Sequence, residues 1–176
     1  METSIMNDFK TAIRSAIDEY YSDLKRALSG LEPYELKWQP SLESNSILWL
    51  VWHMARVEDA WVNRTIKNGQ QLWISEKWHE KFNMKPEGSG YGQSPEEIQS
   101  FPHLPIQVLT DYYDQVHDSV IECLENSSEQ DLSKDFSTGN YGPRKVSWIW
   151  GHIIVEESQH LGQIAYIRGL IRGINH

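Results

Sequence analysis

The chain has 176 residues, of which 16 are basic and 25 acidic, giving a formal net charge of −9. This length suits a single domain over residues 1–176, and the acidic balance argues against the cationic surface that unspecific binding to nucleic acid or an anionic membrane needs. A single cysteine, no visible secretory signal and no bilayer-length apolar run predict a cytoplasmic protein without an internal disulfide framework.

Four long segments carry apolar residues at helical spacing and predict four amphipathic helices. The first covers about 5–29, and the second starts at Asn45 or Ser46, either of which can cap it, and continues to about Lys67. The third covers about 105–125, and the fourth covers about 145–172, after a turn-like segment at 139–143. Little of the chain is typical of a strand, so the predicted fold class is all-α, a four-helix bundle.

A long crossover, roughly residues 69–104, separates the second helix from the third. Its glycine-rich middle, 85–95, is typical of a mobile loop, and short helices are expected at about 75–82 and 95–101. A crossover of this length allows the second and third helices to run parallel. Such loops are often functional, so the crossover either helps to cover a site or is a surface connection without a role in chemistry.

The fourth helix combines an apolar stripe with two polar residues. At about 100° per residue, five isoleucines fall in one narrow stripe: Ile149, Ile153, Ile164, Ile167 and Ile171. Glu156 and His160, one helical turn apart, fall in the middle of that stripe. Burying a carboxylate is costly unless a cation or a hydrogen-bonding partner offsets it, and a metal ion is the economical explanation.

His53 is the best candidate for a third ligand. It lies at the margin of the buried face of the second helix, from which its ring can lean inward while the other ring nitrogen finds an acceptor. Two imidazoles and a carboxylate suit Zn²⁺, Ni²⁺ or Fe²⁺, and three protein ligands leave positions open for water or substrate.

Two alternatives to this ligand set remain open. His152, one turn before Glu156, could replace or supplement a ligand, although a place behind the ligands is favoured; Glu157 is expected to be solvated or behind the ligands. A hydrogen bond between Glu156 and His53 or His160, with no metal at all, is the other interpretation.

Two segments carry a family resemblance: Asn45-Ser-Ile-Leu-Trp-Leu-Val-Trp-His-Met-Ala-Arg-Val-Glu-Asp-Ala-Trp61 and His152-Ile-Ile-Val-Glu-Glu-Ser-Gln-His-Leu-Gly-Gln163. Together with the spacing of the four helices, they resemble the DinB-like family of helical-bundle metalloproteins. The resemblance implies a divalent metal held by one histidine on the second helix and two residues four apart on the fourth, here His53, Glu156 and His160. The common family pattern has histidine at the position of Glu156, so this chain resembles a carboxylate-bearing branch.

The resemblance also implies a range of activities. Some relatives are transferases or isomerases that use low-molecular-weight thiols such as bacillithiol or mycothiol, and others are regarded as hydrolases. We therefore expect a metal-dependent enzyme acting on a small molecule, with a thiol as possible cosubstrate. Gln163 could orient the substrate or merely pack, and Arg144 could meet a substrate carboxylate. The alternative is a non-catalytic, stress-related binding protein with a structural metal or none, which a closed four-ligand site including His152 would favour.

Tryptophan placement bears on the oligomeric state. Trp49 and Trp52 point away from the core stripe of the second helix, and Trp148 and Trp150 flank the stripe of the fourth. Either the long crossover folds over these side chains, or they form a homodimer interface, where tryptophan is favoured. Of the two, we favour the homodimer.

Overall fold

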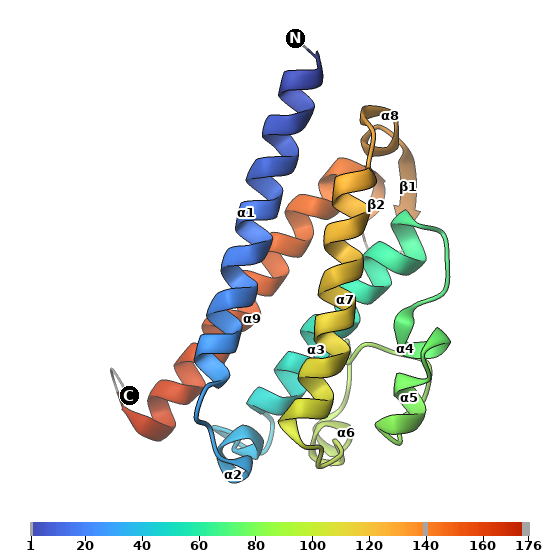
Figure 1. Ribbon diagram of the computed structural model, residues 1–176. Coiled ribbons are helices and arrows are strands. Elements are labelled where there is room, and N and C mark those ends of the chain that lie inside the picture. Colours follow the sequence, from blue (N-terminus) through green and yellow to red (C-terminus); the bar gives the residue numbers. More distant parts are fainter. Residues whose placement is uncertain (1, 139–140, 174–176) are drawn as a thin grey trace.

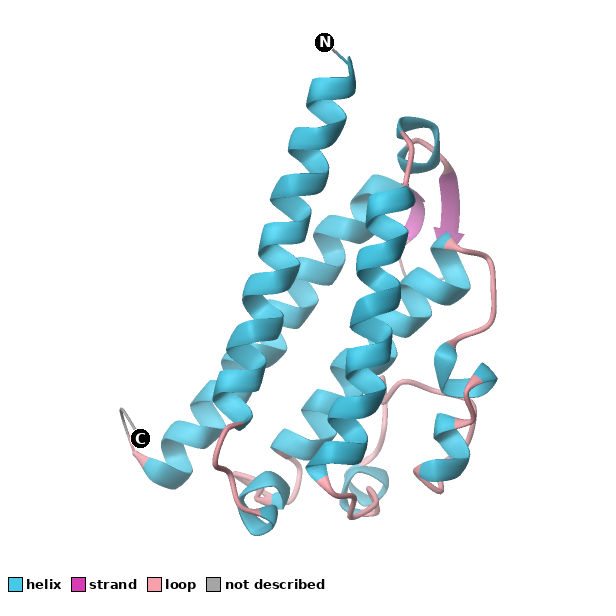
Figure 2. Cartoon of the chain, in the orientation of Figure 1, coloured by secondary structure: helices cyan, strands magenta, loops and turns pink. Residues whose placement is uncertain are grey.

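The computed structural model describes residues 2–138 and 141–173, and most of these lie in helices (Figure 1, Figure 2). The all-α prediction is confirmed, and the four long helices are where the apolar periodicity places them. They are α1 (Glu2–Leu28), α3 (Ile47–Asp59) with its continuation η1 (Ala60–Ile66), α7 (Ile106–Asn126) and α9 (Val146–Arg172).

The long helices form a bundle in which α1 and α9 run in one direction and α3 and α7 in the other (Figure 1). α9 packs against both α1 and α3, and α3 packs against α7. The parallel course of α3 and α7 is the one that the long crossover allows.

α3 is the most enclosed helix of the bundle. Ser46 caps it by accepting a hydrogen bond from the backbone N–H of Trp49 (3.2 Å), and every residue of α3 is buried. Its last turns continue as the π-helical segment η1, where the N–H of Lys67 donates to the carbonyl of Val62, five residues earlier (2.9 Å). π-helical turns are frequent at functional sites.

Short helices fill the connections: α2 (Pro33–Lys37), α4 (Leu72–Ser75), α5 (Trp78–Lys81), α6 (Pro95–Gln99) and α8 (Glu129–Leu132). The helix expected over 75–82 is divided, because Lys77 adopts a left-handed backbone conformation (φ 56°) between α4 and α5. The expected helix at 95–101 is α6, which ends two residues earlier and begins with reciprocal bonds between Ser94 and Glu97.

A short hairpin before α9 corrects the expectation of an almost strand-free chain. β1 (Asp135–Thr138) pairs antiparallel with β2 (Gly142–Lys145), with Phe136 opposite Arg144. Four-residue strands are too short to show a clear alternating pattern in the sequence. Residues 139 and 140 of the expected turn lie outside the described residues.

The crossover covers the tryptophans of α3. Trp49 and Trp52 are buried, and the indole N–H of Trp49 donates to the side-chain carbonyl of Gln93 (2.8 Å). Trp150 is fully buried as well. Of the two interpretations, folding of the crossover over Trp49 and Trp52 is the one observed, and these side chains offer no exposed interface. Within the described residues, no helix has the length and apolar character needed to span a membrane.

Candidate metal centre

α3 and α9 bring the three expected ligands together. The Nε2 atoms of His53 and His160 lie 3.7 Å and 3.4 Å from the same oxygen, Oε1 of Glu156. One ligand atom from each residue lies within 4.8 Å of the others, and in the described part of the chain no other such group of three or more is found. Ligand atoms bound to one tetrahedral zinc ion lie about 3.4 Å apart, so a small inward movement of the rings would suffice to hold an ion.

Hydrogen bonds at the far side of each ring fix which nitrogen is free. Nδ1 of His53 donates to the backbone carbonyl of Ser89, and Nδ1 of His160 donates to the side-chain oxygen of Gln163 (3.0 Å). A carbonyl oxygen can only accept, so each Nδ1 carries the proton and each Nε2 offers a lone pair. Metal-binding histidines are oriented in the same way in proteins. Both lone pairs therefore point toward the Glu156 carboxylate, and the donor set fits a divalent ion.

Glu156 lies at the edge of the buried face and not at its centre, which corrects the helical-stripe prediction. Its side chain is 26% exposed, while His53 is 7% exposed. When a ring is protonated on both nitrogens, its Nε2–H faces this carboxylate, and this contact with His160, and then with His53, holds the pKa of the Glu156 carboxyl well below its usual range. The carboxylate is thus ionised and available, without the full cost of burial.

The crossover holds His53 in place. The indole of Trp49 stacks on one face of the His53 ring, with centroids 4.9 Å apart and planes at 13°. The backbone of the Ser89–Gly90 segment closes over the same ring: a Cβ added at Gly90 would lie 2.5 Å from Trp49 and 3.2 Å from Nδ1 of His53. Gly90 also has φ +98°, a conformation that other residues rarely adopt. Glycine is therefore required where the crossover meets the ligand.

A buried ion pair that the sequence analysis missed anchors this crossover. Asp59 accepts the backbone N–H groups of Leu72 (2.9 Å) and Trp73 (2.8 Å), and Arg56 donates to the carbonyl of Gly88 (2.9 Å). Nη1 of Arg56 lies 3.6 Å from Oδ2 of Asp59, and both side chains are buried. Ser89, the residue after Gly88, accepts the hydrogen bond from His53. Two residues of α3, Arg56 and His53, therefore hold two neighbouring carbonyls of the crossover. Charged residues inside the apolar run of α3 were the signal for it.

A second cluster of polar side chains lies in the core beside the ligands. Glu58 and Glu157 are fully buried, so of the two positions expected for Glu157, solvated or behind the candidate ligands, the solvated one is wrong. The hydroxyl of Tyr113 donates to Oε1 of Glu58 (2.5 Å) and lies 3.0 Å from Oε2 of Glu157. Tyr20 adds a 3.0 Å bond to Glu58. A hydroxyl has one proton, so the contact with Glu157 is best satisfied when Glu157 is protonated and donates to Tyr113.

Burial explains the protonation of this core cluster. Burial, followed by the nearby charge of Glu58, raises the pKa of Glu157 well above its usual range. Burial also raises the pKa of Glu58 to about 7, although hydrogen bonds from Tyr113 and Tyr20 act in the opposite direction. Glu157 therefore holds a proton where Glu156 holds none.

The other residues singled out by sequence lie around the ligands. Gln163 orients His160, as described above. His152 is outside the ligand group; its ring stacks on Trp148, with centroids 4.5 Å apart, and burial lowers its pKa. Arg144 is exposed on β2, with its guanidinium 5.6 Å from the ring centre of Trp148.

A cavity of about 290 Å³ opens beside His53 and Glu156. Its other lining residues come from α3, η1, the crossover and the hairpin: Val57, Ala60, Trp61, Arg64, Thr65, Ser89, Tyr91 and Tyr141. A larger hollow of about 900 Å³ lies between α1 and α9, but none of the three ligands lines it. The smaller cavity is the relevant one, because a molecule bound there would touch two of the ligands.

The bundle and its His–Glu–His group define a class, the helical-bundle proteins that carry a candidate metal centre between two core helices. The chain belongs to the mycothiol-S-transferase family, whose model matches residues 12–173, and this bears out the DinB-like resemblance. A crystal structure of a conserved protein from Enterococcus faecalis has the same fold, with a TM-score of 0.83 and 24% sequence identity over 93% of this chain and 96% of that chain. A comparison with curated proteins gave no match.

Proposed function

We propose that the protein is a divalent-metal-dependent S-transferase that joins a low-molecular-weight thiol to a small electrophile. Family membership supports the thiol chemistry. The observation that carries the metal dependence is the convergence of two imidazole lone pairs on one ionised carboxylate. Thiols of this kind belong to the reducing cytoplasm, which is the compartment we propose and which suits the free, buried Cys123.

The chain would hold the ion through His53, Glu156 and His160, with zinc, nickel or iron as the candidates. An ion bound there would supply an open position at which a thiol is held with a lowered pKa, as thiolate. Three ligands with His152 outside the group favour this open site over a closed structural one.

The transfer itself requires little further chemistry from the protein. The thiol sulfur forms a bond to the electrophilic carbon, the leaving group departs with the bonding electrons, and the thiol proton passes to solvent. Glu156 supplies a fixed negative charge beside the ion, and the cavity positions the electrophile next to the sulfur. The related hydrolytic reaction would use water in place of the thiol.

Metal analysis of the purified protein tests the site. The wild-type protein is expected to retain about one divalent ion per chain after dialysis, and His160→Ala is expected to retain none. His103→Ala is the matched control, because His103 is exposed and outside the ligand group. Equal metal contents in wild type and His160→Ala would remove the proposed site.

A thiol screen tests the reaction. Metal-loaded protein is incubated with a chloronitrobenzene as electrophile and with mycothiol, bacillithiol, glutathione or no thiol, and the coloured thioether is measured. Turnover is expected with one of these thiols and is expected to fall to background in His160→Ala. Formation of the nitrophenol without thiol would indicate a hydrolase, and no product with any of these thiols would favour the non-catalytic binding protein.

We also propose a homodimer, now based on the outer face of α9. Val155, Tyr166 and Leu170 are 54%, 67% and 50% exposed on this helix, which is much apolar surface for one exposed face. A symmetric dimer would bury the same face of both copies. Size-exclusion chromatography with light scattering is expected to give twice the 20.5 kDa of one chain, and Tyr166→Glu is expected to give the monomer.

A further inference from the structure

The cavity beside the ligands continues along one face of α3 into η1. His53, Val57, Ala60 and Arg64 all line it, at spacings of four, three and four residues. Such spacings place side chains on neighbouring turns of the same helical face. The ligand His53 is therefore at one end of this row and the cation Arg64 is at the other, at most about 16 Å along the helix axis.

Arg64 is a cation without a partner. Within the described chain, its guanidinium makes no hydrogen bond and no ion pair. Nearby basic residues are engaged: Arg56 bonds to Gly88, and Lys67 bonds to Ser119 (2.8 Å). A guanidinium presents a planar fork of donors that matches a carboxylate with two parallel hydrogen bonds. In a chain of net charge −9, a free guanidinium in a cavity wall favours an anionic guest.

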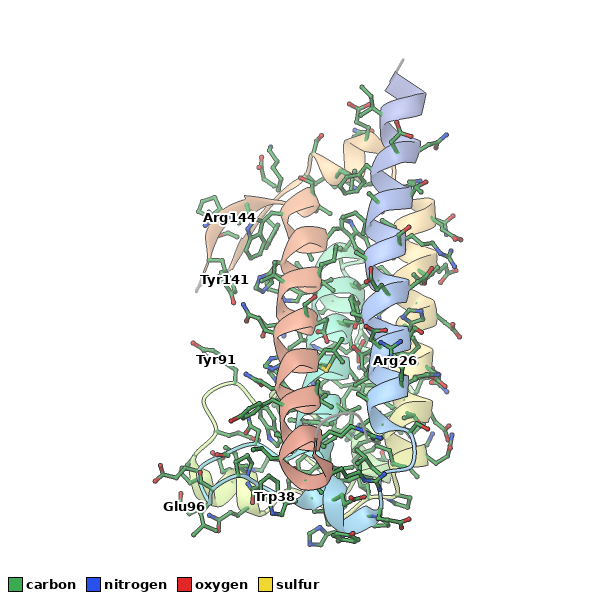
Figure 3. All side chains as sticks on the ribbon, turned by 90° about the vertical axis from the view of Figure 1, so that its left-hand side faces the viewer. Arg26, Trp38, Tyr91, Glu96, Tyr141 and Arg144 are labelled. Atoms are coloured by element: carbon green, nitrogen blue, oxygen red, sulfur yellow. The ribbon has the colours of Figure 1, made fainter. Side chains whose placement is uncertain are left out.

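Three aromatic side chains from different segments form much of the remaining wall. Trp61 comes from η1, Tyr91 from the crossover and Tyr141 from the end of the hairpin turn. Tyr91 and Tyr141 lie along the same edge of the molecule, although they come from different segments (Figure 3). Flat aromatic side chains pack well against the apolar or ring-shaped body of a small molecule. A volume of about 290 Å³ corresponds to roughly ten water molecules, which limits the guest to a small metabolite.

We propose that this cavity binds a small carboxylate-bearing molecule, with Arg64 paired to the carboxylate and the reacting end of the molecule beside His53 and Glu156. The guest is the thiol or its electrophile, so the assignment of the reacting end rests on the proposed function. The anion-binding end does not depend on it, because Arg64 and the aromatic walls are outside the ligand group.

Matched probes test the role of Arg64. Zinc-loaded protein is titrated calorimetrically with ω-mercaptocarboxylates from mercaptoacetate to 6-mercaptohexanoate and with the ω-mercaptoalcohols of equal length. We expect the acid to bind about tenfold more tightly than the alcohol at the best chain length, as a charge-assisted contact of about 1.4 kcal/mol gives. Arg64→Gln is expected to abolish this preference, and Arg64→Lys to retain part of it, since the charge remains but the fork is lost.

Two further variants locate the effect. Arg26→Gln makes the same change of charge on α1, away from the edge that carries Tyr91 and Tyr141 (Figure 3), and is expected to keep the tenfold preference. Arg144→Gln tests the cation that sequence alone suggested. The proposal is overturned if wild type binds acid and alcohol equally, if the preference survives in Arg64→Gln, or if Arg144→Gln is the variant that loses it.

A metal-free arm separates this proposal from the proposed function. Metal-free protein is titrated with hexanoate and 1-hexanol, which carry no thiol, and the zinc content of Arg64→Gln is measured alongside. A preference for hexanoate that is lost in Arg64→Gln supports the anion site even if no variant binds metal. A preference found in both series shows that Arg64 binds the carboxylate without help from the metal or the thiol, and one found with the thiols alone shows that the carboxylate binds only when the sulfur is held at the ion.

Discussion

Glu156 and Glu157 are adjacent on α9, and their surroundings differ in every respect that matters for a carboxyl group. Glu156 is partly exposed and faces two imidazoles, which hold its pKa well below the usual range. Glu157 is sealed in the core and faces Tyr113 and Glu58, and burial raises its pKa. A rotation of about 100° around the helix separates the two environments.

The comparison shows that deep burial does not keep a carboxyl group ionised and available to a metal ion. The more deeply buried residue is neutralised by a proton, which a hydroxyl network can share at little cost. A carboxylate that is to bind an ion needs an edge position, where its charge survives and an ion can reach it. The core pair, Glu58 and Glu157, contributes to the packing of α3 against α9. Glu156, together with His53 and His160, forms the candidate metal site.

Removing the edge carboxylate gives the largest expected effect. Glu156→Ala should weaken zinc affinity by more than 100-fold, because a ligand and its charge are lost. The free energy of unfolding of the metal-free protein should change by less than about 1 kcal/mol, since the side chain is partly solvated. Competition with a coloured chelator measures the zinc affinity, and urea denaturation measures the free energy of unfolding.

Glu157→Gln is the control and should bind zinc within about threefold of wild type. Comparable losses of zinc affinity in both variants would contradict the proposal that Glu156 binds the ion and Glu157 does not.

Neutralising the core pair should change the pH dependence of stability. The pKa of Glu58 in the folded state is about 7, above its ordinary value of 4.5, so the folded protein binds more protons between these values. Its contribution to the free energy of unfolding is therefore full below pH 4.5 and is lost as pH rises through about 7, at up to about 1.4 kcal/mol per pH unit. Glu58→Gln should be more stable than wild type by about 2 kcal/mol at pH 8 and by much less at pH 5.

Urea denaturation of metal-free protein at pH 5 and pH 8 measures this difference. Glu97→Gln is a suitable control, because Glu97 lies in the exposed capping box of α6. If the stability of Glu58→Gln and wild type differed by the same amount at both pH values, the core pair would not be the titrating element.

Disturbing the crossover should lower the zinc affinity by an intermediate amount. Gly90→Ala places a Cβ within 2.5 Å of Trp49 and forces the Ser89 carbonyl away from His53. Zinc affinity should fall about tenfold, the scale expected when a histidine ligand loses its orienting partner. Gly92→Ala is the control, since Gly92 also has a positive φ but no atom within 4 Å of an added Cβ. Equal affinities for the two variants would show that the contact has no role in metal binding.

The smallest effect is expected for the remaining histidine of α9. His152→Phe preserves an aromatic ring against Trp148, and zinc affinity should stay within about twofold of wild type. A loss as large as that of Glu156→Ala would make His152 a fourth ligand and would favour a structural site.

The helical periodicity of the sequence was sufficient to predict the bundle and to select His53, Glu156 and His160. It was not sufficient to separate Glu156 from Glu157, because the burial of a helical residue depends on how the neighbouring helices cross, which periodicity does not specify. The role of Arg56 and Asp59 depends on where the crossover folds back. That information is in the tertiary structure. The sequence shows only that two charged residues, Arg56 and Asp59, interrupt an apolar run.

The link between the crossover and α3 has a consequence for the metal-free protein. The carbonyls of Gly88 and Ser89 are neighbours; one is bound by Arg56 and the other by His53, which is a proposed metal ligand. If the proposed site binds an ion, metal binding and ordering of this segment are one coupled equilibrium, so each favours the other. We then expect a protease to cut metal-free protein within residues 85–95 faster than metal-loaded protein.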